Sequence, residues 1–314
     1  MRSLVLVLLA LAACSQPKTE EPFTIVMLPD TQLYSEKNPS IFHDQTRWTA
    51  EHVGEENIVF VTHVGDIVQN FAERPEEWEV ADAAMKRLDG LVPWGVAIGN
   101  HDYDRNPDNP RQADKFVEVF GPQRFAGRSW FGGATENGLN SYQLFTGGGR
   151  EFLIFHLESD IPDDTIAWAE SILREHPDTP AIVTTHIYLD DRTNARTAEP
   201  YLLGEAGNSG EAIYQKLIRR NPQIFLVLCG HWATAGGEWF QASPQEGGSE
   251  VFEVLADYQT RENGGDGWLR VIRFDPAGGR IWFKTYSPTL DQHESDENSE
   301  FVFFVDFDQR FGKR

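Results

Sequence analysis

The sequence predicts an α/β fold with mixed β-sheets, and three observations support this class. Short apolar runs rich in β-branched residues recur along the chain, and helical patterns separate most of them. These runs are continuously apolar rather than alternating, which indicates strands that are buried on both faces. In the last third of the chain, strands joined by glycine-rich turns replace the alternation, which indicates an antiparallel end.

The expected elements follow one another in a regular order. Buried strands are expected at Phe23–Leu28, Ile58–Val64, Trp94–Ile98, Glu151–Leu157, Ala181–Thr185 and Ile224–Leu228. Helices, with apolar residues at three- and four-residue spacing, are expected at Ile41–Val53, Glu76–Leu88, Arg111–Phe120, Thr165–Glu175 and Gly210–Arg220. The strands of the last third are expected at Val251–Tyr258, Trp268–Phe274, Arg280–Tyr286 and Phe301–Phe307. Since no repeat or long linker is visible, we expect a single domain over residues 23–314.

The first residues predict a targeting segment rather than part of the fold. Arg2 precedes the apolar run Leu4–Leu11, which is too short to span a membrane, and the run ends in Leu-Ala-Ala-Cys14, a sequence typical of a bacterial lipobox. We therefore predict a signal peptide over 1–13, membrane attachment through a lipidated Cys14, and a flexible tether over 14–22. Ser15 favours an exported lipoprotein on the periplasmic face of the outer membrane. The alternative is an ordinary secretory signal with an incidental cysteine.

The composition excludes one class of partner. Asp and Glu total 49 against 27 Lys and Arg, a formal charge of −22, so we expect no nucleic-acid-binding surface, because nucleic acids are polyanions. The second cysteine, Cys229, lies in the apolar run Ile224–Cys229 and is expected to be a buried structural thiol.

Polar side chains that can bind metal follow five of the predicted buried strands. They are Asp30 and Gln32, then Asp66, then Asn100-His101-Asp102, then His186, then His231. In open α/β sheets, ligands bind at the carboxyl ends of the strands, so five such residues in one structural position predict a site. Carboxylate, amide and imidazole donors suit Mn, Fe, Zn or Mg, as divalent or trivalent ions. Two such ions can hold a phosphoryl group and activate water.

This order of motifs resembles that of the calcineurin-like metallophosphoesterases, over about residues 23 to 308. The motifs read Asp30-Thr-Gln32, Gly65-Asp66, Gly99-Asn-His-Asp102, His186 and Gly230-His231. More narrowly, Leu28-Pro-Asp-Thr-Gln32 resembles a bacterial branch whose first motif carries Gln in place of His, as do Gly264–Arg270 and Thr285-Tyr-Ser-Pro288. The resemblance implies the metallophosphatase fold, a four-layer α/β/β/α sandwich of two mixed sheets around a centre of two metal ions.

The resemblance also implies which residues hold the metals. Asp66 would bridge both ions, Asp30 and Gln32 would serve the first site, and the second site would be completed by Asn100, His186 and His231.

The resemblance implies catalytic roles for the two residues that follow Asn100 in the sequence. His101 would act as general acid to the leaving alkoxide, or as a hydrogen-bond donor in the transition state. Asp102 is expected either to orient His101 or to hydrogen-bond its own turn.

Two departures from the family pattern concern the first metal site. Position 32 is Gln, and the family's Gly-His-x-His motif reads Gly230-His-Trp-Ala233, so Ala233 replaces a ligand. The first site is therefore weak, empty, filled by water or completed by another residue. His63 and Glu238 are candidates for completing it, although a packed strand histidine is the alternative for His63.

The predicted function is metal-dependent hydrolysis of phosphate mono- or diesters by in-line attack of metal-bound hydroxide, in the cell envelope. One alternative is a catalytically reduced lipoprotein that binds a single metal or a ligand on the same fold. Another is a metal hydrolase acting on acyl or sulfuryl esters. Substrate selection is expected in loops 103–115 and 190–209, where Arg105 and Arg192 are candidate phosphate contacts or ordinary surface arginines.

Overall fold

The computed structural model of the chain describes residues 21–234 and 236–312. The predicted signal peptide, Cys14 and most of the predicted tether lie outside these residues. In the described ranges, no helix is both long enough and apolar enough to cross a membrane.

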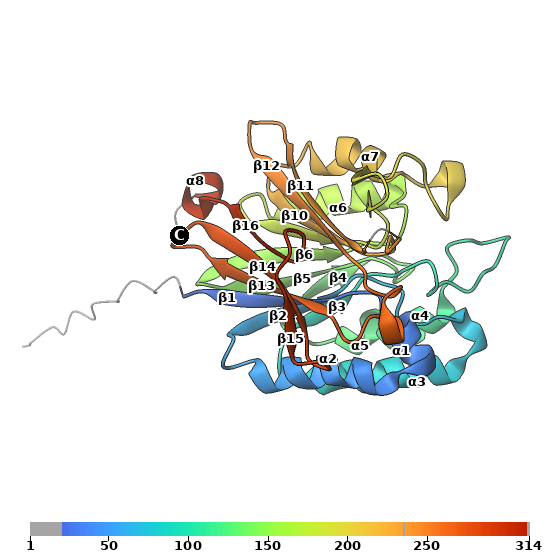
Figure 1. Cartoon of the computed structure of the whole chain (residues 1–314). Helices are drawn as coiled ribbons and strands as arrows, with labels where there is room; N and C mark the ends of the chain where they lie inside the picture. The colour runs from blue at the N-terminus through green and yellow to red at the C-terminus, as the bar shows by residue number, and fades with distance from the viewer. Residues whose placement is uncertain (1–20, 235, 313–314) are drawn as a thin grey trace, which may run out of the picture.

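Two large mixed sheets lie face to face at the centre of the molecule (Figure 1). The first has seven strands in the described part, in the order β15-β14-β13-β1-β2-β3, with β16 also paired to β14. β1, β2 and β3 are parallel, and β13 pairs antiparallel with β1. The strands are β1 (Phe23–Leu28), β2 (Ile58–His63), β3 (Trp94–Val96), β13 (Leu269–Asp275), β14 (Arg280–Ser287), β15 (Gln292–Glu294) and β16 (Glu300–Phe304).

The second sheet also has seven strands in the described part, in the order β11-β12-β10-β7-β6-β5-β4. Its centre is parallel and its edges are antiparallel. The strands are β4 (Phe131–Ala134), β5 (Ser141–Gly147), β6 (Arg150–His156), β7 (Ala181–Thr184), β10 (Ile224–Cys229), β11 (Glu238–Pro244) and β12 (Glu250–Ala256). A small hairpin pairs β8 (Leu189–Asp190) with β9 (Ala195–Arg196).

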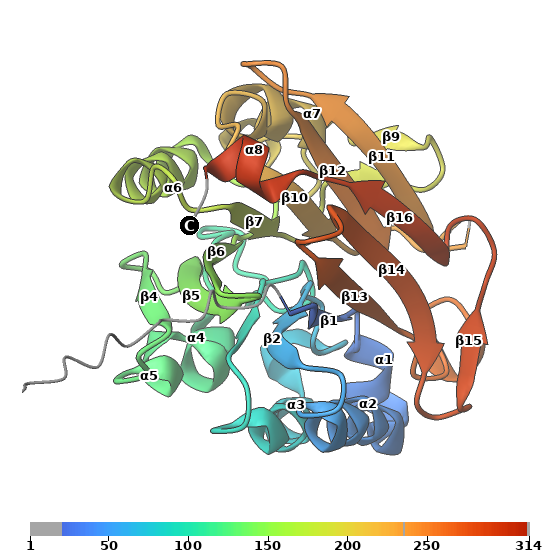
Figure 2. The same ribbon diagram turned by 90° about the vertical axis from the view of Figure 1, so that its left-hand side faces the viewer.

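Helices cover the outer face of each sheet, as Figure 2 shows. Against the first sheet lie α1 (Gln32–Lys37), α2 (Pro39–His52), α3 (Pro75–Met85), α4 (Asp114–Phe120) and α5 (Pro122–Phe125). Against the second lie α6 (Asp163–Glu175), α7 (Gly210–Ile213) and the π-helix η4 (Tyr214–Ile218). The remaining helices are η1 (Phe71–Glu73), η2 (Lys86–Leu88), η3 (Gly204–Ala206), η5 (Glu262–Gly264) and α8 (Phe307–Phe311).

Three buried apolar clusters correspond to the three interfaces between these layers. One fills the space between the sheets, and the other two lie between a sheet and its helices. This arrangement confirms the predicted α/β/β/α sandwich of two mixed sheets.

The predicted elements differ from the structure mainly at the edges and in the last third. The edge strands β4 and β11, and β5 beside β4, were not predicted, because their partial exposure breaks the continuous apolar pattern. The last third is also not wholly antiparallel, since β12 pairs parallel with β10 and is buried on both faces. The strand predicted to reach Phe307 ends at Phe304, and Asp306 caps α8 by accepting a hydrogen bond from the Gln309 amide.

A buried polar network joins the two sheets. His156 of β6 donates from Nδ1 to Oε1 of Gln143 (2.7 Å) and accepts at Nε2 from the Thr62 hydroxyl of β2 (2.9 Å). Thr62 in turn contacts the hydroxyl of Thr184 on β7 (2.8 Å). His156 therefore has a packing role, and its ring is held neutral with the proton on Nδ1.

Candidate metal centre

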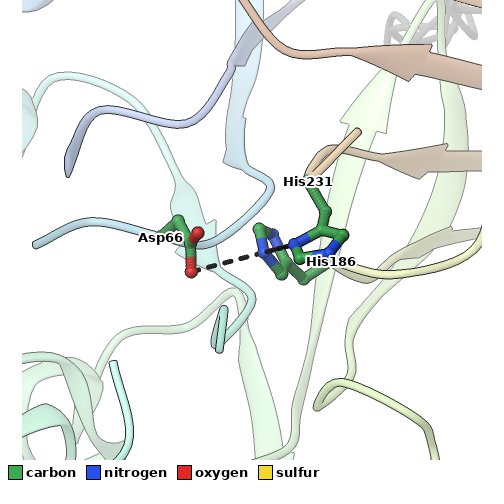
Figure 3. A group of neighbouring side chains, drawn as sticks. All are labelled: Asp66, His186 and His231. Atoms are coloured by element: carbon green, nitrogen blue, oxygen red, sulfur yellow. Dashed lines mark hydrogen bonds and ion pairs between the residues drawn. The ribbon is translucent and has the colours of Figure 1, made fainter. Parts of the chain in front are cut away.

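The predicted ligands meet where the carboxyl ends of strands from both sheets converge. The Nε2 atom of His186 lies 3.3 Å from Oδ1 of Asp66, 3.1 Å from Oδ1 of Asn100 and 3.2 Å from Nδ1 of His231. Figure 3 shows the two histidines and the carboxylate pointing toward one another. The donor atoms of Asp66, His186 and His231 all lie within 4.8 Å of one another, a spacing that a single ion can bridge.

Motif glycines allow the ligand loops to approach this closely. A Cβ on Gly99 would lie 2.1 Å from the Asp66 nitrogen, and one on Gly65 would lie 2.6 Å from the Gly99 nitrogen. A Cβ on Gly230 would likewise lie 2.1 Å from Oδ1 of Asp30. Asp66 and His231 have left-handed backbones, with φ of 51° and 75°, a strain that the surrounding structure must offset.

The residues predicted for the first metal site lie beside this group. Asp30 is buried, and its Oδ2 accepts a hydrogen bond from the His231 amide (3.2 Å) and lies 4.0 Å from Nδ1 of His186. Gln32 is buried as well, and its Oε1 has no hydrogen-bond partner among residues 21–234 and 236–312. A buried amide oxygen without a partner is costly, and a cation would satisfy it.

The electrostatics of the centre also fit bound cations. Burial raises the pKa of Asp30 well above its usual range, and the charges of Asp257 and Asp66 raise it further. Burial would also raise the pKa of Asp66, but the neighbouring His186 outweighs it and lowers that pKa. Burial together with the charge of His186 lowers the pKa of His231 to about 3, so this imidazole is neutral. His186 differs, because burial is outweighed by the neighbouring Asp66, which raises the pKa of this imidazole. Divalent ions bind carboxylates and neutral imidazoles, so a bound ion would displace the proton of His186.

His101 lies beside this group and is held in one orientation. Its amide donates to Oδ1 of Asp66 (2.8 Å), and its ring Nδ1 donates to the Gln69 carbonyl (2.7 Å). The ring stacks on Phe71 (centroids 5.0 Å apart, 19° between planes), and the Arg105 guanidinium lies 3.3 Å from the centroid of Phe71. In the described chain Nε2 of His101 has no hydrogen bond, so it is available to a substrate.

Of the two roles predicted for Asp102, its hydrogen bonds favour bonding of the turn over orientation of His101. Its oxygens accept hydrogen bonds from the amides of Ile67 (2.9 Å), Val68 (3.2 Å) and Gly99 (2.8 Å). Within the described ranges it makes no hydrogen bond to His101. Burial and the charge of Asp66 raise the pKa of Asp102 to about 7. This carboxyl group therefore ties the loop after β2 to the loop after β3.

The family of the chain follows from comparison with known proteins. The family model for calcineurin-like phosphoesterases matches residues 23–235. The chain belongs to this family. It is 32% identical over 307 residues to the uncharacterized protein YvnB of Bacillus subtilis, a match that covers 95% of this chain but only 23% of that much longer relative.

Solved structures show the same fold at low sequence identity. A purple acid phosphatase from yellow lupin seeds has a TM-score of 0.56 and 12% identity, covering 92% of this chain and 55% of that one. A dimetal phosphatase from Danio rerio has a TM-score of 0.55 and 11% identity, covering 90% of this chain and 99% of that one.

Neither residue proposed to replace the family's second histidine reaches the centre. Nδ1 of His63 accepts from the Gly65 amide (3.1 Å) and Nε2 contacts the Thr31 hydroxyl (2.9 Å), so no ring nitrogen is left for a metal. Glu238 is held by Arg261 and Arg270, both at 3.1 Å. His63 instead connects the loop that carries Asp30 to the loop that carries Asp66, through its contacts with Thr31 and Gly65.

Two aromatic residues, Trp232 and Tyr201, line one side of the centre, and only Tyr201 was not predicted from the sequence. The ring of Tyr201, which is 54% exposed, lies 4.5 Å from that of His231, and the ring of Trp232 lies 4.6 Å from it. Arg192 stacks on Trp232 at 3.6 Å and pairs with Asp190 at 2.7 Å, so its charge is already compensated. Arg105 makes no ion pair in the described part of the chain and remains the better candidate for a phosphate contact.

Proposed function

We propose that this calcineurin-like phosphoesterase hydrolyses phosphate mono- or diesters with two metal ions. The observation that carries the proposal is the position of His101 beside the ligand group. Its amide bonds the carboxylate that would bridge the ions, and its ring is fixed by Gln69 and Phe71 with Nε2 left unbonded. A centre that served only to stabilise the fold would have no use for an oriented imidazole beside its ligands.

The roles of the chain's own residues follow from this geometry. When bound, Mn, Fe, Zn or Mg ions would supply Lewis acidity and lower the pKa of a water molecule. Asp66, Asn100, His186 and His231 would hold one ion, and Asp30, Gln32 and Asp66 would hold the other. Because Nδ1 of His101 is committed to a carbonyl, Nε2 is the atom that would donate a proton or hydrogen bond to the leaving oxygen.

The test combines metal content with turnover. The protein lacking residues 1–14 would be analysed for metals and assayed on p-nitrophenyl phosphate and bis-p-nitrophenyl phosphate. His101→Ala should reduce kcat by about 100-fold or more with metal content unchanged. Asp66→Asn should lose both metal and activity. His293→Ala removes an exposed histidine that is not among the predicted ligands. It serves as the matched control and should keep both metal and activity.

The outcomes separate this proposal from its rivals. Full turnover by His101→Ala would remove that residue from the reaction. A wild-type protein that binds metal but hydrolyses neither ester would favour a binding role or another ester. The matching assays are p-nitrophenyl acetate for an acyl ester and p-nitrophenyl sulfate for a sulfuryl ester.

We also propose that Cys14 carries a lipid that places this domain at the periplasmic face of the outer membrane, where it would act on phosphoesters of the envelope. The support is the apolar run ending in Leu-Ala-Ala-Cys14. Cys14→Ser should move the protein from the membrane fraction to the soluble fraction. Unchanged membrane association of Cys14→Ser would contradict the anchor.

A further inference from the structure

A buried carboxylate that no family motif contains lies beside the position of the missing histidine. Asp257 directly follows β12, which runs parallel to β10 with Leu255 opposite Cys229. The residue after Ala256 therefore emerges next to the Gly230-His231 loop. Contacts with Gly237 place Asp257 near Ala233, since a Cβ there would lie 1.6 Å from the Asp257 carbonyl oxygen and 3.5 Å from the Ala233 Cα.

Two further contacts connect the segment after β12 to the other parts of the first metal site, namely the loop of Ala233 and the start of α1. The Thr260 hydroxyl donates to the Ala233 carbonyl (2.7 Å). On the other side, a Cβ on Gly265 would lie 2.6 Å from Oη of Tyr34 and 2.9 Å from the Tyr258 carbonyl oxygen. Tyr34 belongs to α1, the helix that Gln32 begins. The segment that carries Asp257 thus lies between the Ala233 loop and the start of α1.

The Asp257 side chain is buried without an ion pair in the described part of the chain. It is 0% exposed, and Oδ1 and Oδ2 accept hydrogen bonds from the amide (2.9 Å) and side-chain nitrogen (2.7 Å) of Gln259, both neutral donors. No lysine, arginine or histidine forms an ion pair with it among the described residues. Burial raises the pKa of Asp257 to about 6, and the charge of His186 opposes this only in part. Of the charges that raise the pKa of Asp30, that of Asp257 is the strongest, in keeping with two carboxylates that lie near each other. A buried carboxylate in this position needs a positive partner.

We propose that Asp257 is a ligand of the first metal ion, in place of the histidine that Ala233 lacks. This inference rests on the proposed two-metal function. The first site would then consist of Asp30, Gln32, Asp257 and the shared Asp66, and Gln32 would supply its unpartnered Oε1.

The chemistry of the two sites would therefore differ. The first site would have oxygen donors only, which favour hard cations such as Mg or Mn, whereas the two imidazoles of the second site suit Zn or Fe. Two divalent ions would bring four positive charges and Asp30, Asp66 and Asp257 three negative ones, leaving a net charge of +1 for phosphate binding.

The test uses Mn²⁺ as the probe on the protein lacking residues 1–14. Elemental analysis after dialysis counts bound Mn²⁺, and electron paramagnetic resonance distinguishes a spin-coupled pair from an isolated ion. Wild type is expected to bind two coupled ions. Asp257→Asn, which preserves size, is expected to bind one ion with an uncoupled spectrum. Glu253→Gln, a buried carboxylate of β12 that pairs with Arg196, is the matched control and should bind two.

A second variant guards against a folding defect. Asp257→Asn combined with Ala233→His restores the family's ligand and is expected to recover the second ion, with circular dichroism confirming that each variant is folded. Two coupled ions in Asp257→Asn would overturn the assignment of Asp257 while leaving the two-metal function intact. Fewer than two ions in the wild type would overturn the two-metal proposal itself, and the assignment with it.

Discussion

At the scale of single residues, the orientation of His101 depends on a neighbour that takes no part in the chemistry. Phe71 has a left-handed backbone (φ 57°) and stacks on the imidazole, while the Arg105 guanidinium packs on the same phenyl ring. The aromatic ring therefore fixes both the candidate acid and the candidate phosphate contact. A strained residue at such a position indicates a positioning role.

Replacing this ring should reduce turnover without removing metal. Phe71→Leu is expected to lower kcat by roughly 10- to 100-fold, because a small displacement of a catalytic group is enough for such a loss. Metal content should stay the same. Phe304→Leu, at a phenylalanine that is 70% exposed, is the control and should behave as wild type. Equal kcat for Phe71→Leu and wild type would contradict the positioning role.

At this same scale, the sequence predicted residue types better than residue partners. Asp66 and His186 could be identified because each directly follows a buried strand. The role of Asp102 could not, since orienting a histidine and bonding a turn require the same side chain. Asp257 was missed because it lay inside a strand predicted to continue to Tyr258, although the strand-end rule applied to β12 as it ends at Ala256 would have found it.

At the scale of elements, the loops after β2 and β3 behave as one unit. Gly65 packs against the backbone of Gly99, Gly99 packs against that of Asp66, and Asp102 accepts hydrogen bonds from amides of both loops. Asp66, the carboxylate proposed to bridge the ions, is thus placed by the loop that carries Asn100. No side chain fits between the two loops.

A methyl group at this contact should disrupt the centre. Gly99→Ala places a Cβ 2.1 Å from the Asp66 nitrogen, and the overpacking should cost about 1–3 kcal/mol of unfolding free energy together with bound metal. Urea unfolding and elemental analysis measure both effects. Gly54→Ala, where a Cβ meets nothing within 4 Å, is the matched control. Equal losses in the two variants would show that the close loop contact is unimportant.

The network between the sheets makes stability depend on pH. Burial, and to a smaller extent the charge of His63, lowers the pKa of His156 to about 3, compared with about 6.5 in the unfolded chain. Because the pKa of His156 is lower in the folded state, the contribution of this residue to the free energy of unfolding is complete above pH 6.5. That contribution is lost progressively as the pH falls toward 3.

His156→Gln should therefore weaken this dependence. Below pH 6.5 the wild type loses stability by protonating His156 on unfolding, and the variant has no such group. The difference in unfolding free energy between wild type and variant should shrink by about 2 kcal/mol from pH 7 to pH 5. Urea unfolding with chelator at both pH values measures it. A constant difference would show that His156 does not titrate on unfolding.

At the scale of the whole molecule, a net charge of −22 opposes the approach of an anionic substrate. Salt screens this long-range repulsion more than it screens contacts within the centre. We expect kcat/KM for bis-p-nitrophenyl phosphate to rise about two- to three-fold between 10 and 200 mM sodium chloride. A fall over that range would mean that the local field of the centre dominates the encounter.

The whole architecture was predictable to the level of layers, because buried strands and covering helices leave strong periodic signals. The pairing of the strands was not predictable in the same way. β12 lies between β10 and β11, and nothing in its apolar composition distinguishes a parallel neighbour from an antiparallel one. Register, rather than composition, decides which side chains reach the centre.

Because the ligands come from strands of both sheets, a bound ion would act as a cross-link. Asp30 and His231, which already share a hydrogen bond, are separated by 201 positions along the chain. An ion held between these two segments would link distant parts of the chain, as a disulfide does in other proteins. Cys229 does not supply such a link, since it is a buried free thiol. Chelation should then speed unfolding by roughly 10-fold and leave refolding nearly unchanged, as for a contact formed after the transition state. Stopped-flow measurements with and without chelator would show whether metal release is the first step by which the two sheets separate.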